Sequence, residues 1–290
     1  MEDVVTVGLD GSAESLAAAR WAAAEADRRR CTLRLLHAWV LLTPAPAGIP
    51  AEDSQNYWAE RVVRDAAKEL SRRHPHLPIV EDLTAQEASE ALLDAAARSR
   101  LLVLGSRGLS APASFFLGDV GMYVTARSER PVVLVRAHAE AGTADEPGVE
   151  SVGVVAGVSL HGACDRLLDF SFEAAADQGL RLRLVHGRSL PVVAYAPWGV
   201  EPDVAAQVRQ QAETELTELV EGWRRQYPGV RVTAEVRLES PARAVTQVGR
   251  TASLLVVGRR HKPLLAPHLG PVAHAAVHHA DCPVAVVPHE

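Results

Sequence analysis

The chain has 290 residues, of which 48% are hydrophobic and 23% are charged, and its formal net charge is -6. This apolar content is enough for two buried cores, whereas an acidic balance without a basic run argues against nucleic acid as a partner. No apolar run approaches the roughly 18 residues that a membrane-spanning helix needs, so we expect no membrane span.

Short apolar runs alternate with longer amphipathic segments in the first half of the chain. The runs are rich in Val and Leu, as expected for parallel strands covered on both faces. The segments between them repeat apolar residues at three- and four-residue spacing, which predicts helices. We expect Ser12 and Ser54 to cap the first two helices, and residues 118–120 to open the last one. In chain order the other predicted elements are strand 4–9, helix 12–30, strand 33–39, helix 54–73, strand 77–83, helix 86–99, strand 101–105 and strand 131–135.

The second half repeats this pattern, with predicted strands at 151–158, 180–187, 230–238, 254–258 and 283–288. Asp10 aligns with Ser159, and His37 aligns with His186, at the same offset. The polar segment 137–150 contains a Pro-Gly pair and is predicted to link domains 1–136 and 151–290. Alternating strands and helices predict an α/β fold with two tandem, doubly wound, five-stranded parallel sheets flanked by helices.

The cysteines are few and far apart. Cys31, Cys164 and Cys282 form no C-x-x-C pair, which is typical of a protein in a reducing cytoplasm. The first ten residues lack the basic start of a secretion signal. The sequence therefore predicts a cytoplasmic protein whose cysteines are small buried thiols.

Residues suited to ligand binding follow three predicted strands of the first half, where ligands bind in open parallel sheets. Asp10 follows the first strand, and His37 and Ala38 end the second. Residues 104–108, Leu-Gly-Ser-Arg-Gly, end the fourth strand, and nine residues separate Gly108 from Gly118. Glycines allow a close backbone approach or a positive φ, and a helix start at Gly118 would attract phosphate oxygens.

This G-x-x-G, nine residues, G pattern resembles the ATP-binding pattern of the universal stress protein family. The opening V-G-x-D-G-S and the closing C-P-V-x-V-V are also similar to that family, and they cover nearly the whole chain. The resemblance implies a Rossmann-like domain, a cytoplasmic location, and ATP bound without strong hydrolysis. It implies that Asp10 holds the ribose and that Ala38 and Leu104 lie near the adenine. The residues that it places at the ribose and phosphates are Gly105, Arg107, Gly108, Gly118 and Val120.

Position 119 departs from the family pattern, because Asp119 stands where nucleotide-binding members have Ser or Thr. A carboxylate there would repel a phosphate by about 1–4 kcal/mol at roughly 4 Å. A bridging Mg²⁺ would reverse that sign. The interpretation that we favour is that Asp119 is only a helix N-cap, with weakened ATP binding as the consequence.

The second copy departs further from the pattern. Ser159 and Leu160 replace the aspartate and the glycine after it, His261 replaces the second Gly of G-x-x-G, and Pro271 follows Gly270. We therefore expect no ATP in the second domain, which would act as a structural half.

Several weaker signals leave alternatives open. His274 and His278 have a spacing that can hold a metal ion, but no carboxylate or cysteine completes the set, so solvated histidines are favoured. His37 is expected to be a hydrogen-bonded residue beside the cleft rather than a catalyst. Trp58 and Trp198 are either partner anchors or core residues, and the core interpretation is favoured.

Two features concern partners. The long connections 41–53 and 189–202 could form a lid or a partner surface. The closing strands begin after prolines and should lie at sheet edges, and we expect them to pair antiparallel in an internal pseudo-dimer. A homodimer stays open as well. No nucleophile, base and orienting group occur together, so the sequence predicts a non-enzymatic stress-response protein. The alternative is a scaffold that binds protein partners without a nucleotide.

Overall fold

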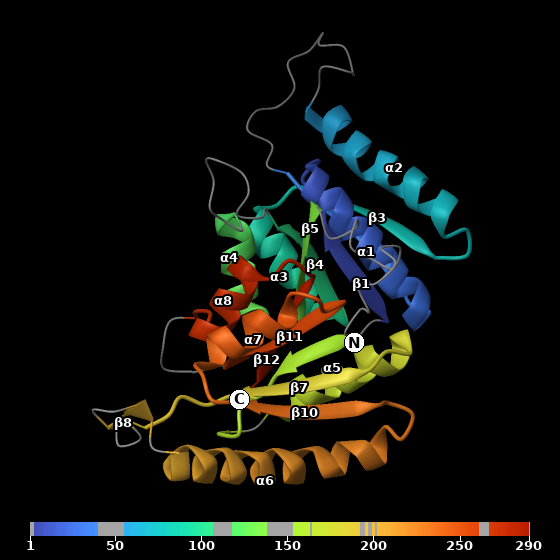
Figure 1. Ribbon diagram of the computed structural model, residues 1–290. Coiled ribbons are helices and arrows are strands. Elements are labelled where there is room, and N and C mark those ends of the chain that lie inside the picture. The colour runs from blue at the N-terminus through green and yellow to red at the C-terminus, as the bar shows by residue number, and fades with distance from the viewer. Residues whose placement is uncertain are drawn as a thin grey trace. The chain divides into compact units, whose positions relative to one another are not determined.

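The computed structural model divides into two compact units, Met1–Ala141 and Gly142–Glu290 (Figure 1). Each unit has its own sheet and helices. The residues that the structure describes are 3–39, 55–106, 118–137, 153–162, 164–191, 195–196, 199–200, 202–260 and 267–289.

The first unit alternates strands and helices, as the sequence predicted. Its elements are β1 (Val4–Gly8), α1 (Ala13–Arg29), β2 (Thr32–Ala38), α2 (Gln55–Arg73), β3 (Ile79–Thr84), α3 (Ala88–Arg98), β4 (Leu101–Ser106), α4 (Asp119–Arg127) and β5 (Val132–Arg136). The strands follow the order β5-β4-β1-β2-β3, and neighbouring strands are parallel. Helix α1 packs against α2 and α3 packs against α4, so one helix pair covers each face of the sheet (Figure 1).

Burial in this sheet explains why its central strands are almost continuously apolar. Val5 and Val7 of β1 are fully buried, and so is Val103 of β4, which pairs with Val7. The edge strand β3 alternates between half-buried and exposed residues, and Val80 is 47% exposed. Central strands of a parallel sheet lose solvent on both faces, whereas an edge strand does not.

Helix α1 combines a good N-terminal cap with a small-residue face. The Ser12 side chain accepts a hydrogen bond from the Ser15 amide at 3.1 Å, which confirms the predicted cap. Alanine has the highest helix propensity of all residues, and its small side chain lets α1 lie close to the sheet. The alanines of this helix that are at most 2% exposed are Ala17, Ala18, Ala19, Ala22, Ala23 and Ala26.

The second unit repeats this architecture and adds one short hairpin. Its main elements are β6 (Val154–Gly157), α5 (Asp165–Gln178), β7 (Leu182–Gly187), α6 (Pro202–Gln226), β10 (Val232–Arg237), α7 (Pro241–Gly249), β11 (Leu254–Arg260), α8 (Pro271–His279) and β12 (Val284–His289). The order is β10-β7-β6-β11-β12, again with parallel neighbours. The pair β8 (Tyr195–Ala196) and β9 (Gly199–Val200) is antiparallel and was not predicted.

Several predictions about connections can be compared with this architecture. Strands β5 and β12 lie at one end of the strand order in their own units, as predicted for the closing strands. Ser54, Trp198 and residues 41–53 and 138–150 lie outside the described residues. The predicted pairing of the closing strands in a pseudo-dimer stays a prediction.

Candidate functional site

The strand order of the first unit reverses beside β1, because the chain runs from β1 to β2 on one side and returns to β4 on the other. In open α/β sheets, ligands bind beyond the carboxyl ends of the strands at such a point. Asp10 follows β1, Ala38 ends β2, and Leu104 and Gly105 lie in β4. The fold therefore brings these predicted site residues to the same edge of the sheet.

Asp10 is held in a tight turn before α1. Its Oδ1 accepts hydrogen bonds from the Ser12 amide at 2.9 Å and from the Ser12 hydroxyl at 2.5 Å. Gly11, between them, has a φ of 83°, which favours glycine. Asp10 is exposed, so its carboxylate is oriented by the helix cap and still accessible to a ligand.

His37 and Ala38 end β2 beside this turn. The His37 Nδ1 lies 2.7 Å from the carbonyl oxygen of Leu9, which confirms that His37 is a hydrogen-bonded residue of the cleft. Ala38 is half-buried and pairs with Thr84 of β3. A small side chain at that place leaves room beside the strand end.

Gly105 has a packing role that the sequence did not indicate. A Cβ on Gly105 would lie 2.6 Å from the backbone carbon of Glu14 and 2.7 Å from the amide nitrogen of Ser15. Gly105 does not have a positive φ, so the prediction that it needs glycine for its backbone conformation is wrong. Its missing Cβ admits the first turn of α1, and its contact with a nucleotide stays a prediction. Leu104 is 6% exposed and points toward Gly8, where a Cβ would lie 2.9 Å from its Cδ2.

Gly118 and the two residues after it form an accessible helix start. Gly118 is the N-cap of α4, and no side chain among the described residues caps this end. The interpretation of Asp119 as the N-cap is wrong, because Asp119 is the first residue inside the helix. A Cβ on Gly118 would meet no described atom within 4 Å, and Val120 is 37% exposed. Arg107 and Gly108 lie outside the described residues.

The corresponding edge of the second unit contains a cavity of about 620 Å³. It lies where the strand order reverses between β6 and β11, and its lining includes Gly157 and Gly258 of these strands. Ser159 takes the place of Asp10. Its hydroxyl donates to the His161 carbonyl at 3.1 Å and accepts from the Arg260 Nη2 at 3.2 Å.

The comparisons with known proteins agree with this doubled architecture. The family model described as the universal stress protein family matches residues 1–136 and again residues 153–288. The chain belongs to the universal stress protein family.

Relatives of this chain match it over almost their full length, so the similarity extends over both units. A universal stress protein of Mycobacterium tuberculosis is 30% identical, over 97% of this chain and 96% of that protein. One from Mycolicibacterium smegmatis is 26% identical, over 98% of this chain and 96% of that protein. A solved universal stress protein from Archaeoglobus fulgidus has a TM-score of 0.65 at 14% identity, with full coverage of both chains, and it shows the fold.

The predictions for the cysteines and for Trp58 of this universal stress protein have different outcomes. All three cysteines are buried and free, as predicted. Trp58 is 55% exposed, with the Arg61 guanidinium 5.3 Å from its ring centroid, so the core interpretation is wrong. The Tyr57 ring contacts Trp58 edge-on, with centroids 5.9 Å apart, and the Trp58 ring is still accessible.

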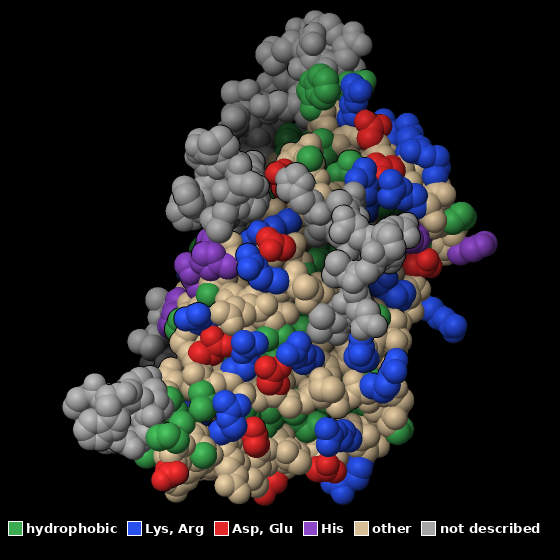
Figure 2. Space-filling model, viewed as in Figure 1, with side chains coloured by type: hydrophobic (Ala, Val, Ile, Leu, Met, Phe, Trp, Pro, Cys, Tyr) green, Lys and Arg blue, Asp and Glu red, His purple; other side chains and the backbone are tan. Residues whose placement is uncertain are grey.

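The histidines of α8 and the charged surface are two further candidate features of the molecule. The rings of His274 and His278 lie 4.3 Å apart. Within the described ranges, no group of three His, Cys, Asp or Glu could hold a metal ion. No described helix is long and apolar enough to cross a membrane. On the face that Figure 2 shows, basic and acidic side chains are interspersed rather than gathered by sign.

Sequence reasoning did not predict which residues line the cavity of the second unit. Arg188, Arg260, His161, His186 and His268 line it, and of these only His186 was given a place in the repeat, as the counterpart of His37. Their positions just at or after strand ends of one sheet edge were a signal that the sequence already contained.

Proposed function

We propose that this tandem universal stress protein binds an adenine nucleotide in its first unit only and acts through conformation or partners rather than catalysis. The observation that carries this proposal is the presence in one unit of an oriented, exposed Asp10 and of a helix start at Gly118 that no described side chain caps. A carboxylate is suited to ribose hydroxyls, and free amides at a helix start are suited to phosphate oxygens. The family resemblance assigns both roles to these positions.

Asp119 sets the strength of binding in this proposal. It is exposed in the first turn of α4, where a carboxylate interacts favourably with the helix dipole. The same carboxylate would lie beside the phosphates and repel them by about 1–4 kcal/mol. Mg²⁺ bound between Asp119 and the phosphates would offset that repulsion.

The second unit supports the restriction to one site. The Ser159 hydroxyl is already engaged by His161 and Arg260, so it is a poor substitute for a ribose-binding carboxylate. Pro271 opens α8 and has no amide N–H for a phosphate. ATP therefore lacks both of its expected contacts in that unit.

The test is calorimetry with ATP, with and without Mg²⁺, on the wild type and on Asp119→Ser. Removing one repulsive charge should tighten binding about tenfold in the absence of Mg²⁺, with a smaller gain in its presence. The matched control is Pro271→Ser, which makes the corresponding change in the second unit and should give no gain.

A different outcome would favour the alternative function. If neither the wild type nor Asp119→Ser binds ATP, the chain is better described as a scaffold for protein partners. The exposed Trp58 ring is the observation that favours such a surface. A cytoplasmic location, a homodimer and the absence of strong hydrolysis remain parts of the same proposal.

A further inference from the structure

Two histidine side chains lie side by side on the accessible surface of α8. His274 is exposed and His278 is half-buried, and their ring centroids are 4.3 Å apart, with the ring planes tilted by 49°. Residues four apart share one face of a helix, so the backbone itself brings the two rings together. Figure 2 shows histidine side chains, in purple, gathered on this part of the surface.

The separation of the two rings suits a single metal ion. Two imidazole nitrogens that bind one tetrahedral ion at about 2.0–2.1 Å lie roughly 3 Å from each other. Rings whose centroids are 4.3 Å apart reach that spacing by rotation about side-chain bonds, with no change in the helix. The sequence spacing of His274 and His278 is also that of the two histidine ligands in helical zinc sites.

The place of the pair near the end of α8 favours a cation. His278 lies in the last turn of the helix, which ends at His279. The C-terminal end of a helix carries a partial negative charge, and this charge stabilises a positive ion beside the last turn. Lys and Arg do not occur in α8, so the helix brings no permanent positive charge that would repel the ion.

The matching helix of the first unit shows that the fold does not require histidines here. At the offset that aligns the N-cap glycines of the two helices, Met122 and Ala126 of α4 take the places of the two histidines. Both helices have nine residues and follow the fourth main strand of their unit. Apolar residues are therefore compatible with both places, and the packing of the helix does not explain the imidazoles.

We propose that His274 and His278 chelate a divalent transition-metal ion of the Zn²⁺ class, with water at the remaining coordination positions. Imidazole nitrogen suits Zn²⁺ and Cu²⁺, whereas Mg²⁺ and Ca²⁺ prefer oxygen ligands. No group of three His, Cys, Asp or Glu in the described part of the chain forms a closed site. The ion is therefore exchangeable, unlike the ion of a four-ligand structural zinc site.

The experiment is calorimetry on the full chain with Zn²⁺, in the absence of nucleotide. We expect a site for one ion per chain, with binding at least about tenfold weaker in His278→Ala, because one of the two protein ligands is lost. Excess Mg²⁺ should not displace Zn²⁺ from this site. Binding of one ion per two chains would overturn the proposal, because histidines of two copies would then complete the coordination.

His279→Ala is the matched control. His279 is the next residue along the same helix, but it does not share a face with His274. Its replacement should change the affinity for Zn²⁺ by less than about twofold. Equal losses in His278→Ala and His279→Ala would overturn the proposal, because binding would then not depend on the pair at four-residue spacing.

A second measurement guards against effects on folding. Neither His274 nor His278 belongs to the buried residues of α8, and alanine has the higher helix propensity, so the alanine variants should fold. A ligand that binds only the folded chain stabilises it against denaturant. Saturating Zn²⁺ should raise the unfolding midpoint of the wild type and of His279→Ala, but not that of His274→Ala. An equal rise in His274→Ala would overturn the proposal.

Discussion

The two sheet edges share their backbone arrangement and differ in their charge. In each unit a histidine at the end of the second strand has its Nδ1 at hydrogen-bond distance from the carbonyl that follows the first strand, as His37 and His186 show. Each last helix begins after a glycine N-cap. Asp10 gives the first edge a carboxylate, whereas arginines line the second. The comparison teaches that a shared scaffold can keep its backbone geometry while the charge of the side chains at its sheet edge changes.

The largest expected effect concerns the glycines that both edges retain. Gly105→Ala should lower the free energy of unfolding by about 3 kcal/mol, because the new Cβ would meet the backbone of Glu14 and Ser15, which cannot move alone. Gly258→Ala should cost about 1 kcal/mol, because its nearest obstacle is the His289 side chain at 2.4 Å. Denaturant unfolding followed by circular dichroism measures both.

The control for this comparison is Gly118→Ala. A Cβ at this position has no described neighbour within 4 Å, so the change in stability should stay below about 0.5 kcal/mol. Equal losses at Gly105 and Gly118 would show that the close approach of α1 is not what requires glycine.

The next effect is a pH dependence from the second edge. Burial lowers the pKa of His186 in the folded state, so the unfolded chain takes up this proton more readily. Stability is therefore full above the ordinary histidine pKa of about 6.5 and decreases as the pH falls below it toward the folded value.

The measurement is the free energy of unfolding of the wild type and His186→Asn from pH 8 to pH 5. The variant should show a shallower decrease below about pH 6.5. Parallel curves over that range would mean that His186 does not contribute to the acid sensitivity.

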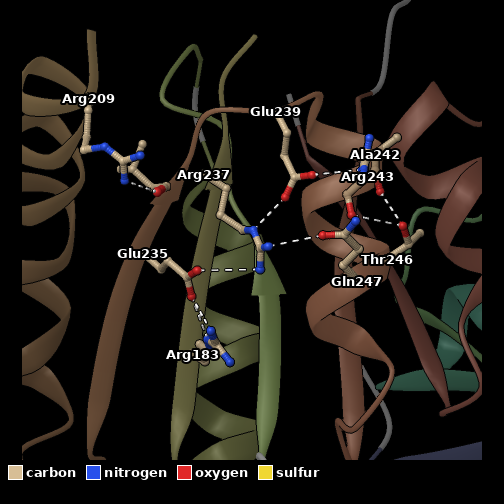
Figure 3. Close-up of polar contacts among 10 residues, drawn as sticks. Arg183, Arg209, Glu235, Arg237, Glu239, Ala242, Arg243, Thr246 and Gln247 are labelled. Carbon is tan, nitrogen blue, oxygen red and sulfur yellow. Dashed lines mark hydrogen bonds and ion pairs between the residues drawn. The ribbon is translucent and has the colours of Figure 1, made fainter. Parts of the chain in front are cut away.

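The smallest effect concerns the ion pairs around Glu239 in the second unit. Figure 3 shows these ion pairs. Glu239 accepts from the Arg237 Nε at 2.6 Å and from the Arg243 Nε at 3.2 Å, just before Pro241, which lines the cavity. Glu239→Gln should lower stability by about 0.5 kcal/mol, because pairs near solvent contribute little.

The matched control is Glu221→Gln, because that carboxylate pairs with Arg224 on an exposed part of α6, and its effect on stability should be smaller still. A larger loss in Glu221→Gln than in Glu239→Gln would show that the degree of burial does not set the strength of these ion pairs.

Much of the fold could be predicted because its signals are local. The buried strands are runs of Val and Leu, and the Ser12 cap is a short-range contact. The role of Gly105 could not be predicted, because its neighbours Glu14 and Ser15 are distant in the sequence. The pair β8 and β9 has two residues per strand, which is too short for a periodic pattern.

The candidate sites were predicted less completely than the fold. The resemblance directed attention to Asp10, which follows β1 at the strand-reversal point, and to Gly118, which is the N-cap of α4. For the second copy, the resemblance indicated only which residues of the nucleotide-binding pattern are absent, and it gave no role to Arg188 or His186. Whether an arginine or histidine atom is buried without a partner depends on packing, which only the structure describes.

The contacts of Gly105 and Gly258 have a consequence for how such sequences are classified. Both glycines are explained by neighbouring protein atoms, the first by the backbone of α1 and the second by His289 and Leu167. A copy that binds no nucleotide would still need glycine at this position for packing. A glycine here is therefore not by itself a sign of nucleotide binding, whereas Gly118, where a Cβ would meet no described atom within 4 Å, has no such packing explanation.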